Sequence, residues 1–206
     1  PLTGIMLHTA LAMEETSEQG RSDLERVASE AQRCAIIARR LLAFSKSEDS
    51  RTAPLSLLKV LTESVELARA HESVKMLQVV LPDSDATIVA DQQQMIQVLV
   101  NILINAGQAM AGNGVIRCSI SSDDDHATLR IEDEGKGMSE EELARAFDPF
   151  YTTKEDGTGL GLAVTYGIID GHGGSINLTS TPGKGTTVCI TMPVGTKEER
   201  PFGFNG

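Results

Sequence analysis

The hydrophobic residues of this chain change their spacing near residue 50, and that change divides its 206 residues into two kinds of structure. From Leu24 to Leu41, apolar residues recur alternately three and four positions apart, as in a coiled coil or four-helix bundle. We predict a helical hairpin over residues 1–48, broken at Glu14–Arg21, that forms half of a dimeric four-helix bundle. A hairpin that packs on its own domain is the alternative.

The boundary lies at Ser47–Pro54, a stretch of turn-forming residues, charges and a closing proline. We therefore predict a linker over residues 49–54 and a mixed α/β domain over residues 55–194. Residues 195–206 show no hydrophobic period, so we predict a disordered tail there.

Helical and alternating patterns follow one another within residues 55–194. Helices are predicted at Leu55–Ala70, Asp91–Met110, Ser139–Phe147 and Leu162–Asp170. Strands are predicted at Val74–Leu81, Ala86–Ala90, Gly114–Ser121, Ala127–Glu132, Ser175–Ser180 and Thr186–Met192. Because hairpins occur beside strands that are separated by helices, we predict an α+β protein. Its second domain would be an α/β sandwich with a mixed sheet covered by helices on one face.

Net charge and cysteine content limit which partners and which cellular compartment we expect. A net charge of −11 leaves no basic patch that could neutralise phosphates, so we expect no nucleic-acid partner. Three widely spaced cysteines suggest neither a zinc site nor a disulfide framework, as in a reducing cytoplasm. No apolar run approaches the roughly 20 residues of a membrane span. We expect a cytoplasmic segment without membrane contact, and whether the parent protein is anchored stays open.

The predicted helix Asp91–Met110 carries an unusual polar stripe. Its core positions are apolar, yet Gln97, Asn101, Asn105 and Gln108 recur along one face. A solvent-facing stripe usually holds Glu and Lys, so a row of neutral carboxamides favours the wall of a cleft. The carbonyl oxygen of Asn also suits a Mg²⁺ ion that is already bound by phosphate oxygens. A plain solvent-facing stripe is the alternative.

Two glycine-rich segments follow. Gly135 and Gly137, between Asp133 and Met138, would let the backbone approach a flat ligand, although an ordinary turn is the better explanation of this motif alone. The second segment is stronger, because its alternating glycines precede a helix whose N-terminal amides can converge on phosphates. It consists of Gly157, Thr158, Gly159, Leu160, Gly161 and Leu162.

The residues before the second glycine segment form a predicted mobile loop that would close over a ligand. The loop contains Thr153 and Lys154, and Lys154 would bring a point charge to a terminal phosphate. Further along, Thr186 starts the last predicted strand. There a hairpin turn and a contact with a ligand are equally good interpretations.

The order and spacing of these motifs together resemble the catalytic core of sensor histidine kinases, especially the nitrogen-regulator type. These kinases belong to the gyrase, Hsp90, histidine kinase and MutL ATP-binding family. The resemblance covers residues 1 to about 193. The segments similar to the family's N box, first glycine box, F box, second glycine box and last glycine box are, in that order, Asn101–Asn105, Asp133–Gly137, Phe147–Phe150, Gly157–Leu162 and Gly185–Thr186.

The resemblance implies a role for each matching residue. Asn105 would bind Mg²⁺, Asn101 would support the phosphates of ATP, and Asp133 would accept a hydrogen bond from the adenine amine. Many relatives carry a basic residue where Gln108 stands, and Lys154 would supply that charge instead. The full set that would contact ATP is Asn101, Asn105, Gln108, Asp133, Gly135, Gly137, Met138, Thr153, Lys154, Gly157, Thr158, Gly159, Leu160, Gly161, Leu162 and Thr186.

Position 101 separates two activities within this family. Members that hydrolyse ATP are similar to one another in carrying Glu four residues before the metal-binding Asn, where it activates water. Asn101 cannot act as a base at neutral pH, so bound ATP should await a better nucleophile than water. The resemblance therefore implies a histidine kinase of a two-component system. It would form a homodimer and pass phosphate through its histidine to an aspartate of a response regulator receiver domain.

The resemblance also implies where the acceptor histidine stands. Pro1–Ile5 is similar to the end of the family's phosphoacceptor box, which places that histidine five positions before Pro1. His8 is followed by Thr9 where an acidic partner is expected, so the chain as given should bind nucleotide without phosphorylating itself. An ATP-driven clamp of the gyrase or MutL kind, a non-catalytic dimerising module and a serine kinase that binds sigma factors are the alternatives.

Overall fold

The computed structural model describes Leu24, Val27 and residues 52–154 and 157–194. Contacts divide the chain into two compact units. Among the described residues, 52–147 and 165–194 form what we call the α/β unit, and 148–154 and 157–164 belong to the second unit. The predicted hairpin and tail lie outside the described residues, apart from Leu24 and Val27, which are helical. Within the described part, no helix is both long and apolar enough to cross a bilayer.

The α/β unit begins with a strand and two helices and ends with a hairpin. Its elements in chain order are β1 (Ala53–Ser56), α3 (Leu57–Ala68), α4 (Glu72–Lys75), β2 (Gln78–Val80), β3 (Thr87–Ala90), α5 (Gln92–Ala109), β4 (Val115–Ser122), β5 (His126–Asp133), α6 (Glu140–Ala144), α7 (Gly161–Gly171, which starts in the second unit), β6 (Ser175–Thr181) and β7 (Gly185–Pro193).

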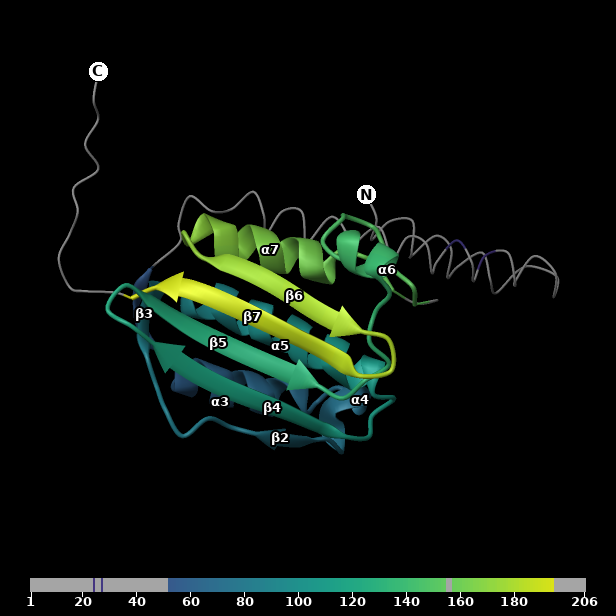
Figure 1. Cartoon of the computed structure of the whole chain (residues 1–206), viewed down its shortest axis with the longest axis horizontal. Coiled ribbons are helices and arrows are strands. Elements are labelled where there is room, and N and C mark those ends of the chain that lie inside the picture. The colour runs from purple at the N-terminus through teal and green to yellow at the C-terminus, as the bar shows by residue number, and fades with distance from the viewer. Residues whose placement is uncertain (1–23, 25–26, 28–51, 155–156, 195–206) are drawn as a thin grey trace, which may run out of the picture. The chain divides into compact units, whose positions relative to one another are not determined.

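The strands form a five-stranded sheet in the order β2-β4-β5-β7-β6 and a two-stranded sheet of β1 and β3. Strand β2 runs parallel to β4, and the other neighbours in the large sheet are antiparallel, which confirms the predicted mixed sheet. Helices α3 and α5 lie side by side behind this sheet in the view of Figure 1.

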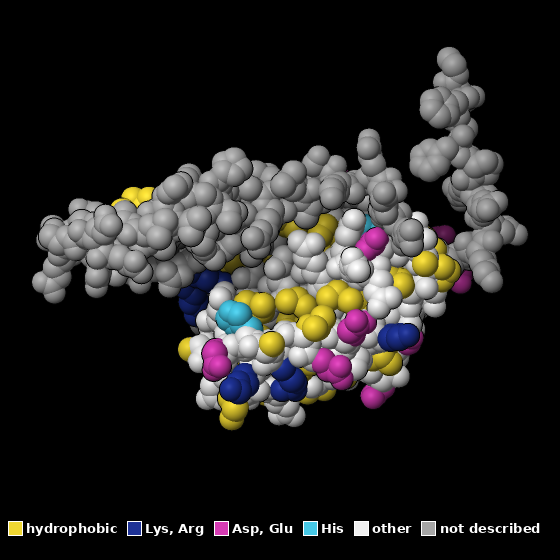
Figure 2. All heavy atoms as spheres, turned by 180° about the vertical axis from the view of Figure 1, so that it is seen from behind, with side chains coloured by type: hydrophobic (Ala, Val, Ile, Leu, Met, Phe, Trp, Pro, Cys, Tyr) yellow, Lys and Arg dark blue, Asp and Glu magenta, His cyan; other side chains and the backbone are white. Residues whose placement is uncertain are grey.

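Alternation along the strands explains why the helices cover one face. In β4, Ile116, Cys118 and Ile120 are buried, whereas Arg117 and Ser119 between them are exposed. Burying such an alternating apolar set is what fixes the register of a sheet, because a slip of one residue would expose it. From behind, hydrophobic side chains form a band across the described part, with acidic and basic side chains beside it (Figure 2).

Polar side chains fix the beginnings of the helices. The Oδ1 atom of Asp91 accepts a hydrogen bond from the backbone N–H of Gln94, so the predicted N-cap of α5 is confirmed. Ser139 and Glu142 form the predicted capping box at α6. Asp85 was not anticipated: its carboxylate accepts hydrogen bonds from the hydroxyl of Ser56 and the backbone N–H groups of Leu58 and Ala86 at the start of α3.

In the first half of the α/β unit, one predicted strand was wrong and one predicted helix was too long. The strand predicted at Val74–Leu81 is the short helix α4 followed by β2, because the buried residues Val74 and Leu77 are three positions apart, which suits a helical turn and not strict alternation. The predicted helix Leu55–Ala70 is present as α3, but the prediction begins two residues too early, where β1 ends, and stops two residues too late. Pro54, which we expected in the linker, lies in β1 opposite Val89, and among the described strands β1 pairs with β3 alone.

Candidate functional site

Asp133, the last residue of β5, is the carboxylate around which the site is built. Its Oδ1 atom accepts hydrogen bonds from the backbone N–H of Gly135 at 2.9 Å and of Thr186 at 3.2 Å. Thr186 reaches it because Asp133 and Thr186 are paired across β5 and β7. No hydrogen bond to Oδ2 comes from the described residues, so that oxygen can accept one from a ligand. Burial raises the pKa of Asp133, the two amides lower it, and the net pKa lies above the ordinary value.

Gly135 and Gly137 are required by contacts with protein backbone. A Cβ atom on Gly135 would lie 2.7 Å from the Cβ of Ala109 in α5, and one on Gly137 would overlap the carbonyl oxygen of Thr181. Gly137 also has a φ of +67°, which favours glycine. The loop therefore needs both glycines to fit between α5 and the β6–β7 turn, which agrees with the ordinary turn that the sequence favoured for this motif alone.

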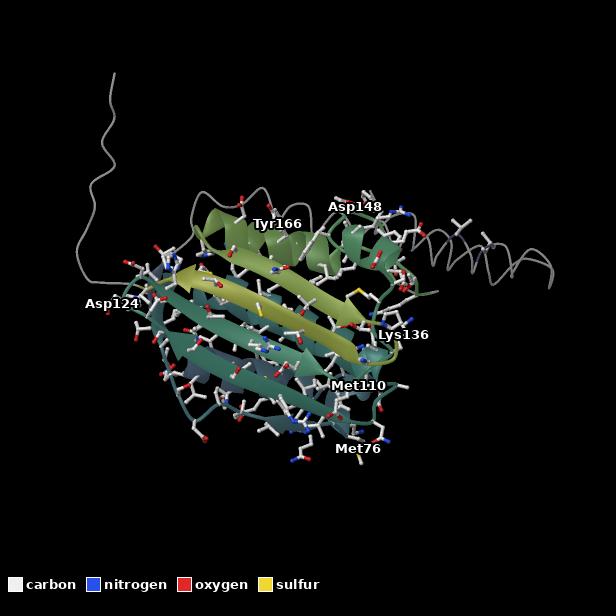
Figure 3. All side chains as sticks on the ribbon, viewed as in Figure 1. Met76, Met110, Asp124, Lys136, Asp148 and Tyr166 are labelled. Atoms are coloured by element: carbon white, nitrogen blue, oxygen red, sulfur yellow. The ribbon has the colours of Figure 1, made fainter. Side chains whose placement is uncertain are left out.

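Hydrogen bonds through Lys136 hold the same loop in place. Its backbone N–H donates to the carbonyl of Ala109 at 3.1 Å, and its own carbonyl accepts from the N–H of Gly183 at 2.7 Å. Figure 3 accordingly shows Lys136 and Met110 at one end of the sheet, with Asp124 in the β4–β5 turn at the opposite end. The C-terminal end of α5 is thus fixed beside Asp133.

Asn101 and Asn105 follow the same helix toward this loop. Asn101, Asn105 and Ala109 are spaced four residues apart, so they lie along one stripe of α5, and the last of them contacts Gly135. Asn101 and Asn105 are half-buried and Gln108 is exposed, while the core face of the helix is fully buried. The carboxamides are therefore not enclosed in an apolar core, and their row ends at the Asp133 loop.

Sequence reasoning missed Ser180, which links Met138 to Thr186. The hydroxyl of Ser180 donates to the carbonyl of Gly185 at 2.8 Å and accepts from the N–H of Met138 at 2.9 Å. Its oxygen lies 3.0 Å from the hydroxyl of Thr186, which must donate because the Ser180 proton is already used. The hydroxyl oxygen of Thr186 keeps its acceptor capacity. Only the register of β6 against β7, in which Ser180 faces Thr186, could have identified Ser180.

The second unit contains the predicted loop and the second glycine segment. The N–H of Phe150 donates to the carbonyl of Gly159 at 2.9 Å, and the N–H of Gly157 donates to the carbonyl of Lys154 at 3.1 Å. A Cβ atom on Gly159 would overlap the backbone of Phe150, so this glycine is required by the fold of the loop. Helix α7 starts at Gly161, close to its predicted beginning.

Residues of the second unit were predicted to act as a lid, and that role stays a prediction. Thr153 is exposed and Lys154 is half-buried, and Thr158, Leu160 and Leu162 belong to the same unit. The chain segments that end at Phe147 and resume at Thr165, on either side of the second unit, belong to the α/β unit. There the rings of Phe147 and Tyr166 pack with centroids 5.6 Å apart, a contact that the sequence did not reveal.

Sequence comparison places the α5–β7 region in a known family. Residues 90–196 match the family described as histidine kinase-, DNA gyrase B- and HSP90-like ATPase. Sporulation kinase E of Bacillus subtilis is 39% identical over 171 residues, which are 82% of this chain and 23% of that protein. The sensor histidine kinase ZraS of Escherichia coli K12 is 33% identical over 179 residues, 86% of this chain and 38% of that protein. The chain thus spans well under half the length of these two relatives.

Structural comparison agrees with the fold. Full-length ShkA in complex with AMPPNP has a TM-score of 0.72 and 24% identity, covering 97% of this chain and 44% of that chain. The catalytic domain of histidine kinase ThkA, in a nucleotide-free form, has a TM-score of 0.62 and 28% identity, covering 70% of this chain and 96% of that chain.

Proposed function

This chain belongs to the family of histidine kinase-, DNA gyrase B- and HSP90-like ATPases, and from that premise we propose that it binds Mg–ATP as the catalytic core of a sensor histidine kinase. One observation carries the proposal. The stripe of Asn101, Asn105 and Ala109 on α5 ends in contact with the loop of Asp133, whose Oδ2 atom is available to a ligand. Two carboxamides and then one carboxylate therefore lie in a row. The carboxamides would match the phosphates of ATP, and the carboxylate would match its adenine.

Each of these side chains has a definite task toward the nucleotide. Asp133 would accept a hydrogen bond from the adenine amine through Oδ2, while its Oδ1 atom stays engaged with two backbone amides. Thr186 offers a hydroxyl oxygen beside it. Asn101 and Asn105 would face the phosphates, where an amide group can donate to a phosphate oxygen or offer its carbonyl oxygen to a cation.

These side chains suit a Mg²⁺ ion that is already bound to the phosphates of the nucleotide. Among the described residues, no group of three or more His, Cys, Asp or Glu side chains could hold a metal ion. Mg²⁺ usually keeps water and phosphate oxygens and takes one or two protein ligands, a role that the carbonyl oxygen of Asn105 can fill. The ion would neutralise charge on the phosphates.

The reaction follows from the absence of a base at position 101. Asn101 cannot remove a proton from water, so hydrolysis is slow and ATP persists until a histidine reaches it. The imidazole nitrogen then forms a bond to the γ-phosphorus, the bond to the β–γ bridging oxygen breaks, and ADP leaves. Positioning and charge neutralisation supply the catalysis.

We also propose the wider setting of this reaction. The acceptor histidine would stand in the helical hairpin of a homodimer, upstream of Pro1, and the phosphate would pass to an aspartate of a response regulator in the cytoplasm. Similarity to a sporulation kinase and to a sensor histidine kinase supports signalling by phosphate transfer.

Replacing Asn101 by Glu tests the proposed division between transfer and hydrolysis. The natural chain should bind Mg–ATP and release phosphate slowly, and N101E should release it faster because the carboxylate can activate water. N101Q is the matched control, since it keeps the length of Glu without the charge and should stay slow. Rapid turnover by the natural chain would instead support an ATP-driven clamp, and equal turnover by N101E and N101Q with intact binding would refute the argument.

A further inference from the structure

His172, immediately after α7, uses both of its ring nitrogens within the α/β unit. Its Nδ1 atom lies 2.7 Å from the carbonyl oxygen of Ile168, and its Nε2 atom lies 3.0 Å from the backbone nitrogen of Asp91. A carbonyl can only accept and a backbone N–H can only donate. The ring is therefore neutral, with its proton on Nδ1, and its Nε2 atom accepts.

The partner of Nε2 is the first residue of the asparagine helix. Asp91 joins β3 to α5 and caps that helix through its own side chain. The imidazole thus bridges the C-terminal end of α7 and the N-terminal end of α5, which are 81 residues apart in sequence. In Figure 1 these ends lie near β3, at one edge of the unit.

The end of α7 that carries His172 is itself held firmly. The N–H groups of His172 and Gly174 both donate to the carbonyl of Ile169, at 3.1 and 3.0 Å. A Cβ atom on Gly174 would approach the carbonyl oxygen of Thr191 in β7 to 2.7 Å, so the chain there lies directly against the sheet. Because His172 precedes this segment, the imidazole holds the backbone of Asp91 at a fixed distance from the sheet.

Helix α5 is therefore fixed at both ends, with the asparagines between them. At its C-terminal end, Ala109 accepts from the N–H of Lys136, and a Cβ atom on Gly107 would lie 2.5 Å from the carbonyl oxygen of Ser73. At its N-terminal end, the backbone N–H of Asp91 donates to His172, and the side chain of Gln92 donates to the carboxylate of Glu63 in α3 at 2.9 Å. A helix rises about 1.5 Å per residue, so Asn101 lies roughly 15 Å from that end.

We infer that His172 is a positioning residue for nucleotide binding: its bond to the Asp91 N–H holds α5, and with it Asn101 and Asn105, in place against the sheet. This inference rests on the proposed function, because it assumes that those asparagines face the phosphates. His172 itself lies at the other end of the helix and contacts Asp91 and Ile168, so it acts through α5.

Two substitutions separate the two bonds of the imidazole. His172→Gln can present a carboxamide oxygen where Nε2 stands, which keeps the bond to Asp91 and loses the one to Ile168. His172→Asn can donate from the position of Nδ1, which keeps the bond to Ile168 and loses the one to Asp91. Each variant loses one hydrogen bond, so their melting temperatures should fall by similar amounts.

The measurement is the affinity for Mg–AMPPNP, together with hydrogen exchange of the Asp91 amide, for the natural chain and both variants. We expect H172Q to bind as the natural chain does and to keep the Asp91 amide protected. H172N should expose that amide and bind about fivefold more weakly, the equivalent of one ordinary hydrogen bond. Asp123→Ala is the control, because it removes an acceptor of two backbone amides in the β4–β5 turn, and the hydrogen bonds of this carboxylate involve neither α5 nor α7.

The outcomes distinguish this inference from the proposed function. If the natural chain does not bind Mg–AMPPNP, the proposed function fails. If it binds and the two variants have equal affinities, or if affinity follows melting temperature across all variants including D123A, His172 is merely structural and the inference is refuted.

Discussion

Replacing Asp133 by Asn should separate the stability of the fold from nucleotide binding. Asn keeps an oxygen where Oδ1 accepts from the amides of Gly135 and Thr186, and it puts an NH₂ group where Oδ2 stands. Burial raises the pKa of Asp133, which means that the folded protein pays to keep this carboxylate charged. The neutral side chain removes that cost, so D133N should melt at the same temperature as the natural chain or slightly above it.

The same substitution should weaken ATP binding strongly. Hydrogen bonds to charged groups contribute about 1.5–3 kcal/mol, which corresponds to roughly ten- to 150-fold in affinity. In D133N the adenine amine would meet an NH₂ group, so two donors face each other and neither is satisfied. An inosine nucleotide carries a carbonyl at the position of that amine, and we expect D133N to bind it more tightly than the natural chain does.

D133A is the matched control, because it removes both oxygens. The backbone amides of Gly135 and Thr186 then lose their acceptor, at about 1 kcal/mol or more each, so the melting temperature should fall by about 4–8 °C. Calorimetric titration with Mg–ATP and Mg–ITP and thermal unfolding would measure all three proteins. Unchanged ATP affinity in D133N would exclude Asp133 as the adenine acceptor, and a loss of stability equal to that of D133A would refute the hydrogen-bond geometry.

Three further predictions concern the frame of the α/β unit. Burial raises the pKa of Asp85, but hydrogen bonds from Ser56 and two backbone amides lower it to below the ordinary value. Its contribution to stability is therefore present above the unfolded-state pKa of an aspartate and is lost as pH falls through the folded-state pKa. Acid unfolding curves of the natural chain and D85N should converge at low pH, and a constant difference would contradict this. G137A should destabilise the protein by more than about 2 kcal/mol, because its methyl group overlaps the carbonyl of Thr181, whereas G183A has a similar φ and open space and should cost about 1 kcal/mol; equal costs in urea unfolding would exclude the overlap. S139A should lower stability by about 1 kcal/mol through loss of the α6 cap without changing nucleotide affinity, and a weaker affinity at unchanged stability would contradict that role.

The sequence allowed accurate prediction of those elements whose ends and faces are set by local chemistry. Asp91 caps α5 as predicted, and Ser139 with Glu142 forms the expected capping box, because a helix N-terminus needs an acceptor within three residues. The strands β4 to β7 were predicted to within about two residues, since more buried and less buried positions largely alternate along each of them.

Elements that depend on distant partners could not be predicted in this way. Strand β1 exists because it pairs with β3, more than thirty residues later, and its proline indicated a linker instead. Helix α4 is one turn long, too short for its period to be distinguished from that of a strand.

In the site too, local features could be predicted from the sequence and contacts between distant residues could not. The row of carboxamides and the glycines around Asp133 are visible in the sequence, whereas the reasons for the glycines are not. Gly135 must admit Ala109 from α5, and Ser180 joins the site only through the register of the last hairpin. The bond from Asp91 to His172 likewise joins residues that no local pattern relates.

We propose that a nucleotide and its metal bind against Asn105 and Asn101. Substituting Mn²⁺ for Mg²⁺ tests it most directly, because the paramagnetic ion broadens the NMR signals of nearby nuclei. With Mn–AMPPNP at a small fraction of the protein concentration, the side-chain amide signals of Asn105 and then Asn101 should broaden first. The amides of the β4–β5 turn at Asp123–Asp125 should stay sharp. The proposed binding site would be contradicted if the broadening were centred on other residues, or if Mn²⁺ caused the same broadening without AMPPNP.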